Sequence, residues 1–148
     1  MNRRSIVLGG LALTLAPGLA SAAPRPPAAD EGLVYFYHAR HKESRKKVST
    51  YIKIDRKLVA DLEVGYYTYV YVKAGEHALG VRSGGSLTGI GRTAFPLIVE
   101  GGQTQYIRYS RENIESTVIA DVTAPPAEEA RQEMAHFLYK AAKKDWDR

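Results

Sequence analysis

The sequence predicts a mainly β protein, an antiparallel β-sandwich of about seven strands followed by a C-terminal amphipathic α-helix. Short runs of β-branched and aromatic residues alternate with a period of two, and glycine-rich or charged turns separate them. The last part of the chain changes to a helical period. The clearest run is residues 66–72 (YYTYVYV), in which odd and even positions face opposite sides of a pleated strand.

A removable leader is expected before the domain. Residues 1–22 begin with Arg3 and Arg4, continue as an apolar run and end on Ala20-Ser21-Ala22, which is typical of a secretory signal peptide cleaved near Ala22. A retained membrane helix would need roughly 20 apolar residues, and this run also holds glycines and a proline. The paired arginines are compatible with twin-arginine export as well as with an ordinary leader. We therefore expect a periplasmic or secreted protein, with no transmembrane segment in the mature chain.

Composition narrows the class of protein further. The 148 residues include no cysteine, which excludes disulfides, thiolate nucleophiles, cysteine-based metal sites and a lipid anchor on an N-terminal cysteine. The formal net charge of +5 falls by two when the leader is removed. Such a mildly basic domain is compatible with an anionic envelope surface or an envelope protein as partner, and nothing in it indicates nucleic acid.

The first half of the mature chain reads as linker and strands. Residues 23–32 are rich in proline and predict a disordered linker before a β-sandwich domain of residues 33–123. The strand 33–38 opens this domain and a polar, basic loop follows it. In the strand 49–55, Ile52 and Ile54 are expected to face the core. The strand 58–64 comes next, and Gly65 separates it from the tyrosine-rich strand 66–72.

The second half continues the same alternation. Gly75 is expected at a hairpin turn because glycine tolerates a positive φ, and the strand 76–82 follows it. A glycine-rich loop then leads to the strand 95–99, which carries Pro96 and is therefore expected at an edge or a bulge. The last predicted strands are 104–109 and 117–122.

The C-terminal unit, residues 125–144, predicts a helix. Pro125 and Pro126 suit a first helical turn, and the acidic residues that follow favour the N-terminal end of the helix dipole. Apolar residues then recur at helical spacing. We expect a helix from about Ala127 to Lys143, docked on the sheet or on a partner.

Several of these runs, taken in order, resemble one bacterial family. They are 33–37 (LVYFY), 51–55 (YIKID), 66–72 (YYTYVYV), 74–77 (AGEH) and 102–108 (GQTQYIR). Together they are similar to the domain of unknown function family 2846, and the order of strand, AGEH turn and strand is also similar in architecture to PEGA domains. The resemblance implies a small exported β-sandwich of unassigned activity. It also implies attachment to a membrane through a lipidated cysteine, from which this chain departs.

A basic loop is the first candidate contact surface. Its proposed binding residues are Arg40, Lys42, Arg45, Lys46 and Lys47. Such a cluster could meet phosphates, anionic glycans or an acidic protein surface. It could equally be a solvated loop that protects a sheet edge from aggregation. His38 and His41 lie nearby, but no third ligand has a convincing spacing, so no metal and no cofactor are expected.

The tyrosines of the strand 66–72 are the second candidate. If Val70 and Val72 face the core, then Tyr67, Tyr69 and Tyr71 form an outward ladder. Tyrosine buries a ring while its hydroxyl stays wet, which suits stacking on sugar rings or packing against a partner. Alternatively, the second sheet or the C-terminal helix covers the ladder.

No catalytic motif is present in the sequence. A G-x-S-x-G elbow is absent, and the glycine-rich loop has neither the register nor the following helix of a phosphate-binding loop. The sequence therefore favours a non-catalytic, envelope-associated binding or accessory module of unknown ligand. A structural subunit of a larger envelope assembly and a small hydrolase with a hidden site remain alternatives, and the oligomeric state is not predicted.

Overall fold

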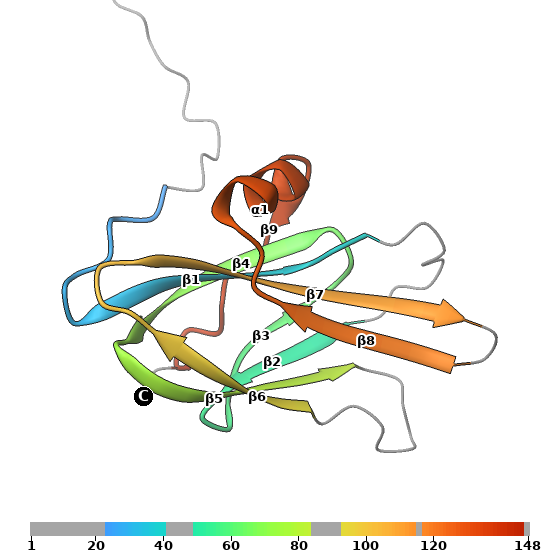
Figure 1. The fold of residues 1–148 in the computed structure, drawn as a ribbon, viewed down its shortest axis with the longest axis horizontal. Coiled ribbons are helices and arrows are strands. Elements are labelled where there is room, and N and C mark those ends of the chain that lie inside the picture. The colour runs from blue at the N-terminus through green and yellow to red at the C-terminus, as the bar shows by residue number, and fades with distance from the viewer. Residues whose placement is uncertain (1–22, 41–48, 84–92, 115–116, 147–148) are drawn as a thin grey trace, which may run out of the picture.

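The structure is a computed structural model, and it describes residues 23–40, 49–83, 93–114 and 117–146. These residues form two stacked sheets with one short helix on top (Figure 1). Sheet A has the strand order β8-β7-β1-β4-β9, and sheet B has the order β3-β2-β5-β6. This arrangement confirms the predicted β-sandwich. The predicted leader, residues 1–22, lies outside the described residues.

The strands correspond closely to the runs that alternate in the sequence. Sheet A contains β1 (Glu31–His38), β4 (Tyr66–Lys73), β7 (Thr104–Ile114), β8 (Thr117–Thr123) and β9 (Leu138–Tyr139). Sheet B contains β2 (Thr50–Ile54), β3 (Lys57–Leu62), β5 (Gly75–Ser83) and β6 (Thr93–Val99). Pro96 lies in β6, which is an edge strand of sheet B as expected.

The core lies between the inner faces of the two sheets. Val34 and Phe36 of β1 and Val70 of β4 contribute from sheet A, and Ile52 and Leu79 contribute from sheet B. Because side chains alternate across each strand, burying these positions fixes which residues face outward. The odd-numbered positions of β1 and β4 therefore lie on the outer face of sheet A.

Two turns show why the chain folds back where it does. Asp55 and Arg56, between β2 and β3, both have positive φ values, 49° and 71°, which matches a two-residue hairpin turn with the favoured twist. Asp55 suits this position because aspartate is enriched among non-glycine residues with positive φ. Gly75 opens β5 with a φ of 136°. The hairpin expected at this glycine is not formed, because β4 and β5 lie in different sheets and the turn joins sheet A to sheet B.

Not every strand pairing is antiparallel. The strand β1 pairs with β7 in parallel, and β4 pairs with β9 in parallel. The remaining pairings are antiparallel, as predicted. The parallel β1–β7 pairing lets strands that are far apart in sequence share one outer face.

The predicted helix is much shorter than expected. The helix α1 (Ala127–Met134) covers only the first part of the range to Lys143. After it the chain returns to the sheet, where Leu138 donates a backbone hydrogen bond to Gly65 at 3.0 Å and Lys140 donates one to Tyr67 at 2.8 Å. Pairing with the edge of β4 therefore overrides the local helical preference of these residues. No helix in the described part of the chain is long and apolar enough to cross a membrane.

The segment expected to be a disordered linker is ordered. Ala28 accepts backbone hydrogen bonds from Glu31 and from Gly102, and Asp30 accepts one from Ala74 at 2.9 Å. Gly101 permits this docking because a Cβ there would lie 1.9 Å from the carbonyl oxygen of Ala29. These contacts tie residues 28–31 to the loop between β6 and β7 and to the β4–β5 turn.

Candidate functional site

Six tyrosines from four strands meet on the outer face of sheet A. Tyr69 of β4 is paired across the ladder with Tyr35 of β1, and Tyr35 is in turn level with Tyr106 of β7. Tyr67 is level with Tyr139 of β9. The resulting surface is called the tyrosine face, and it consists of Tyr35, Tyr67, Tyr69, Tyr71, Tyr106 and Tyr139.

The rings of the tyrosine face contact one another directly. Tyr35 and Tyr106 are stacked, with centroids 5.0 Å apart and an interplanar angle of 12°. Tyr69 lies 5.6 Å from Tyr35 and is stacked at 5.3 Å on Tyr139. Tyr71 meets Tyr69 edge-on at 6.4 Å. Aromatic pairs at such separations attract one another beyond their buried area, so the rings hold each other in place.

An arginine lies at each end of this chain of rings. The guanidinium carbon of Arg25 is 4.0 Å from the ring centroid of Tyr71, and the Tyr71 hydroxyl donates to the Arg25 backbone oxygen at 2.9 Å. At the other end, Arg131 of α1 donates a hydrogen bond through Nε to the Tyr106 hydroxyl at 3.3 Å. The continuous series is called the Arg–Tyr row, and its members in order are Arg25, Tyr71, Tyr69, Tyr35, Tyr106 and Arg131.

The shifted phenols of this face stay protonated. Burial raises the pKa of Tyr35 to about 12, and the neighbouring Tyr106 adds to the shift. Burial also raises the pKa of Tyr71, although Arg25 opposes it, and it raises that of Tyr139. These hydroxyls are therefore neutral groups that donate and accept hydrogen bonds at physiological pH.

The helix α1 covers one side of the tyrosine face. Its buried Ala130 packs with Tyr37 and Tyr106, and Phe137 meets the edge of Tyr37 at 6.0 Å. The predicted ladder of Tyr67, Tyr69 and Tyr71 lies on the outer face of sheet A, and each of its rings is half-buried rather than fully exposed. The ladder thus faces outward, as one alternative expected. The helix shields part of the tyrosine face, as the other alternative expected, and leaves the rest open.

At the edge of the tyrosine face, the two residues of β9 are exposed. Leu138 is 60% exposed and Tyr139 is 37% exposed, which makes them two of the most exposed large hydrophobic residues in the described chain. In contrast, Tyr51, which is 38% exposed, lies on sheet B, away from this cluster.

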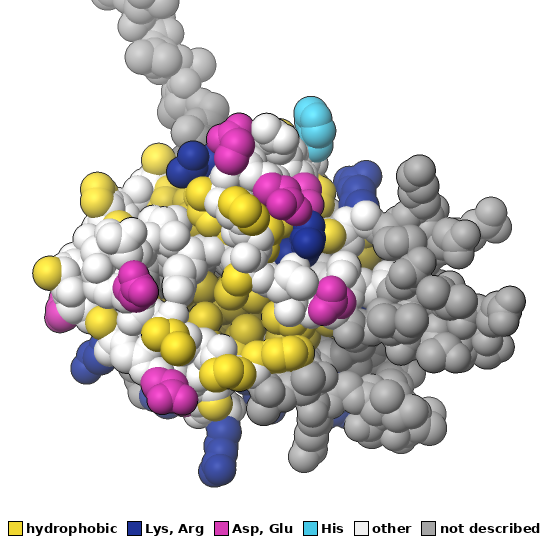
Figure 2. All heavy atoms as spheres, viewed as in Figure 1, with side chains coloured by type: hydrophobic (Ala, Val, Ile, Leu, Met, Phe, Trp, Pro, Cys, Tyr) yellow, Lys and Arg dark blue, Asp and Glu magenta, His cyan; other side chains and the backbone are white. Residues whose placement is uncertain are grey.

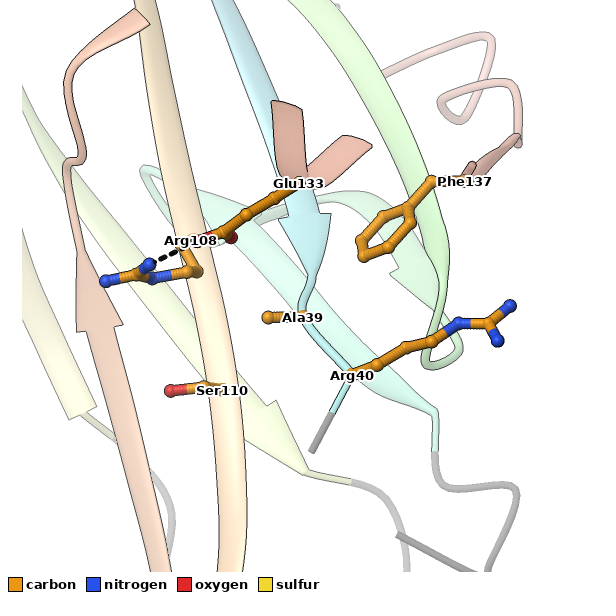
Figure 3. A pocket seen from close by; sticks show the side chains of 6 residues that line it. All are labelled: Ala39, Arg40, Arg108, Ser110, Glu133 and Phe137. Carbon is orange, nitrogen blue, oxygen red and sulfur yellow. Dashed lines mark hydrogen bonds and ion pairs between the residues drawn. The ribbon is translucent and has the colours of Figure 1, made fainter. Parts of the chain in front are cut away.

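A pocket of about 380 Å³ lies beside the covered end of the face, between β1, β7 and the end of α1 (Figure 3). Arg108 and Ser110 of β7, Glu133 of α1, Phe137, Ala39 and Arg40 line it. Its volume lies within the range of small-ligand sites. Figure 3 shows Arg108 and Glu133 pointing toward each other, whereas Arg40 points away from both.

The polar groups of this pocket are engaged in holding α1. Arg108 pairs with Glu133 at 2.6 Å and with Glu129 at 2.9 Å, and it also bonds Thr123 at 3.0 Å. Burial raises the pKa of the adjacent Tyr37 phenol, and the Glu133 carboxylate adds to this shift. The Tyr37 hydroxyl and Glu133 Oε2 are nevertheless both buried without a hydrogen bond of good geometry. Because Arg108 is already bound to two carboxylates of α1, we interpret the pocket as part of the contact between α1 and sheet A.

The basic loop is represented only by Arg40. Arg40 is exposed and its guanidinium packs over Gly65, which has a φ of 82° and where an added Cβ would lie 2.9 Å from Arg40 Nε. The other proposed residues, Lys42, Arg45, Lys46 and Lys47, lie outside the described residues. The basic loop as a contact surface therefore stays a prediction.

Sequence reasoning missed half of the tyrosine face and both arginines. Tyr35 and Tyr106 belong to strands whose neighbours in the sheet are not their neighbours in sequence, and Tyr139 was assigned to a helix. Arg25 was assigned to a disordered linker. The only available signal was the density of tyrosines in the strands, which does not say which of them converge.

The chain matches the sequence model of a protein family over residues 28–122, which is more than half of its length. The description of that family is a protein of unknown function, DUF2846. No curated protein matches the chain. The matched region contains Tyr35, Tyr67, Tyr69, Tyr71 and Tyr106, whereas Arg25, Arg131 and Tyr139 lie outside it.

Proposed function

We propose that this chain, which belongs to the DUF2846 family of proteins of unknown function, works as a non-catalytic, exported binding module of the cell envelope. Its contact surface in this proposal is the tyrosine face. The observation that carries this proposal is the convergence of six tyrosines from β1, β4, β7 and β9 on one side of the sandwich. Solvent-accessible tyrosine is over-represented where proteins meet ligands and partners.

The rigidity of this surface supports the proposal. Four of its rings are carried by the paired strands β1 and β4, whose backbone positions are fixed by the sheet. Their side chains are then fixed by ring contacts between 5.0 and 6.4 Å. A surface that is already ordered loses little conformational entropy when it binds, which favours affinity.

The leader supports an exported location. Residues 1–22 have the three-part pattern of a secretory signal, and cleavage near Ala22 would leave Ala23 two residues before Arg25. The mature N-terminus would therefore begin close to the Arg25 end of the Arg–Tyr row. Attachment to the envelope would then be non-covalent, because the sequence has no cysteine for a lipid anchor.

Sedimentation with envelope material tests this function. The mature protein is mixed with washed envelope particles, and bound and free protein are measured after centrifugation. We expect the double variant Tyr71→Ala with Tyr139→Ala to bind at least tenfold more weakly, which corresponds to about 1.4 kcal/mol. The matched control is Tyr51→Ala, which removes an equally exposed tyrosine from sheet B. Equal binding by the double variant and the wild type would contradict the proposal.

The basic loop is proposed as a second, electrostatic contact. Replacing Arg45, Lys46 and Lys47 by Ala is expected to weaken attachment to anionic envelope material, and moderate salt is expected to do the same. Unchanged attachment in both measurements would remove the loop from the contact surface. The tyrosine face would be unaffected by that result, since its own variants test it separately.

A further inference from the structure

In the described part of the chain, three of the four edge strands of the two sheets are protected. At β3, Lys143 donates a backbone hydrogen bond to the Val59 carbonyl oxygen at 2.8 Å, so the C-terminal segment covers this edge. At β6, Pro96 has no N–H to donate, and Gln105 donates to the Ile98 carbonyl oxygen at 2.6 Å. The strand β9 has only two residues. Coverage, proline and shortness all prevent sheets from pairing edge to edge.

The strand β8 lacks these protective features. It forms the other edge of sheet A, and its seven residues (TVIADVT) contain no proline, glycine or lysine. It pairs with β7, and no other strand of the described chain pairs with it. The N–H and C=O groups that point away from β7 can therefore bond a further strand.

The ribbon of β7 and β8 also extends beyond the rest of sheet A (Figure 1). The pairing of β1 with β7 reaches Tyr109, whereas β7 continues to Ile114. From Ser110 onward, β8 is its strand partner in the described chain. A sheet of two strands is marginally stable in water, and further strands stabilise it. The ribbon therefore favours a strand as the occupant of the open edge.

Hydrophobic surface lies beside the end of β8. Figure 2 shows hydrophobic side chains gathered in the middle of the face that it draws, between the end of β8 and β6. Val122 of β8 and Phe95 of β6 pack against the core and are only partly buried. A partner at this edge would remove such surface from water, which favours association.

The sequence of β8 indicates which strand fits. Its order Thr-Val-Ile-Ala-Asp-Val-Thr reads the same from both ends, except at the two positions that flank the central Ala120. A two-fold symmetric interface must be self-complementary. Antiparallel pairing of two β8 strands about Ala120 sets Thr117 level with Thr123 of the second copy. It likewise sets Val118 level with Val122. Paired threonines are favourable cross-strand neighbours, and β-branched residues suit strands.

We propose that two copies of this chain form a dimer by antiparallel pairing of their β8 strands about Ala120. The two-stranded ribbons then join into a four-stranded sheet. Asp121 lies opposite Ile119 of the second copy, so like charges do not face each other directly. Because residues of equal parity meet, the tyrosine faces of both copies lie on the same side of the joined sheet. This dimer does not depend on the proposed function.

Cysteine crosslinking tests the register, because the chain has no cysteine of its own. In Ala120→Cys the two thiols face each other across the symmetry axis. Directly opposite Cα atoms are about 4.5–5.5 Å apart, which suits a disulfide. We expect mild oxidation to convert this variant of the mature protein into a covalent dimer. The control is Ile98→Cys on the edge strand β6, 63% exposed in the wild type, which is expected to stay monomeric.

Two charged variants test the same register without covalent trapping. In Ile119→Lys each new ammonium group lies opposite Asp121 of the second copy, whereas Ile119→Asp places carboxylates there. Sedimentation equilibrium is expected to show a wild-type dimer. It is also expected to show a dissociation constant at least fivefold lower for Ile119→Lys than for Ile119→Asp. Hydrogen exchange of the wild type needs no variant, and the amides of β8 are expected to exchange more slowly as the protein concentration rises.

Each contrary result overturns the proposal. Equal crosslinking of Ala120→Cys and Ile98→Cys would mean random collisions, and no crosslinking of either would mean that β8 strands do not meet. Equal dissociation constants for the two Ile119 variants would exclude pairing about Ala120. A monomeric wild type, or exchange of the β8 amides that does not depend on concentration, would exclude the dimer even where a variant fails to fold.

Discussion

Arg25 lies over the ring of Tyr71, with its guanidinium carbon 4.0 Å from the ring centroid. The same arginine pairs with Glu31, and its backbone oxygen accepts the Tyr71 hydroxyl. This relationship joins the N-terminal segment of the described chain to the tyrosine-rich strand. The segment before β1 is therefore part of the folded domain and forms one end of the tyrosine face.

The docking of this segment makes a prediction about Gly101. In Gly101→Ala, the new Cβ would lie 1.9 Å from the Ala29 oxygen, so the backbone of the N-terminal segment must move. We expect a loss of about 1–3 kcal/mol in the free energy of unfolding, measured by urea denaturation. The control is Gly80→Ala, where the nearest atom would be 3.6 Å away. Equal stability of the two variants would show that the segment is not docked as described.

The buried histidine predicts a loss of stability in acid. Burial lowers the pKa of His38 to about 4, with Nδ1 3.3 Å from the Leu62 carbonyl oxygen. An unfolded histidine titrates near about 6.5, so the unfolded state takes up the proton first and stability falls as the pH drops from about 6.5 to about 4. The difference corresponds to about 3 kcal/mol.

Urea denaturation across this pH range measures the effect. His38→Gln is expected to flatten the pH dependence of the free energy of unfolding. A proton titration of His38 by NMR gives a second measurement that does not depend on the variant folding. A native pKa at or above the usual histidine value would contradict the prediction.

His77 of β5 is expected to show the opposite pH dependence. Partial burial opposes the protonation of His77, but hydrogen bonds from its ring nitrogens to Asp55 at 2.6 Å and to the Lys73 carbonyl at 2.8 Å outweigh it, so its pKa is raised. The bond to His77 and one from the Ala78 amide lower the pKa of Asp55. His77 therefore adds stability below its unfolded pKa that is lost as the pH rises through its folded pKa.

Asp55→Asn tests this pair while keeping a residue that tolerates the positive φ. We expect the NMR pKa of His77 to fall in this variant. Because Asp55 is more than half exposed, the loss of stability near pH 5 should be under about 1 kcal/mol. A His77 pKa that does not change would show that the carboxylate is not its partner in solution.

The ion pairs of Arg108 are predicted to hold α1 against sheet A. In Arg108→Met, Glu129 and Glu133 lose their shared partner, and we expect the amides of α1 to exchange with deuterium faster, with a loss of about 1 kcal/mol in stability. Glu128→Gln is the control, since Glu128 bonds Gln132 rather than Arg108. Equal exchange of α1 in both variants would mean that apolar packing of Ala130 alone holds the helix.

The β-sandwich could be predicted from the sequence because the alternation of inward and outward residues is visible within each single strand. Residues such as Ile52, Ile54, Val70 and Val72 mark the inner faces wherever they occur, and the structure buries all four. The break in the chain at Gly75 was also visible, and Gly75 has a positive φ, but the expected hairpin was wrong because this turn joins sheet A to sheet B. These features need no knowledge of which strands become neighbours.

What the sequence did not show depends on contacts between distant segments. The Leu138–Tyr139 segment reads as helix, yet it pairs with β4 because Gly65 and Tyr67 offer backbone carbonyls at an open edge. Residues 23–32 read as a linker, yet residues 28–31 dock on the sandwich where Gly101 leaves room. Half of the candidate site was missed for the same reason, since Tyr35 and Tyr106 become neighbours only through a parallel pairing.

Oxidative footprinting of tyrosines tests the central claim most directly. The mature protein is labelled by hydroxyl radicals with and without envelope particles, and the modification of each tyrosine is measured by mass spectrometry. We predict that Tyr71 and Tyr139 are protected when the particles are present, while Tyr51 on sheet B, as exposed as Tyr139, is modified as before. Protection of Tyr51 with continued modification of Tyr71 and Tyr139 would contradict it.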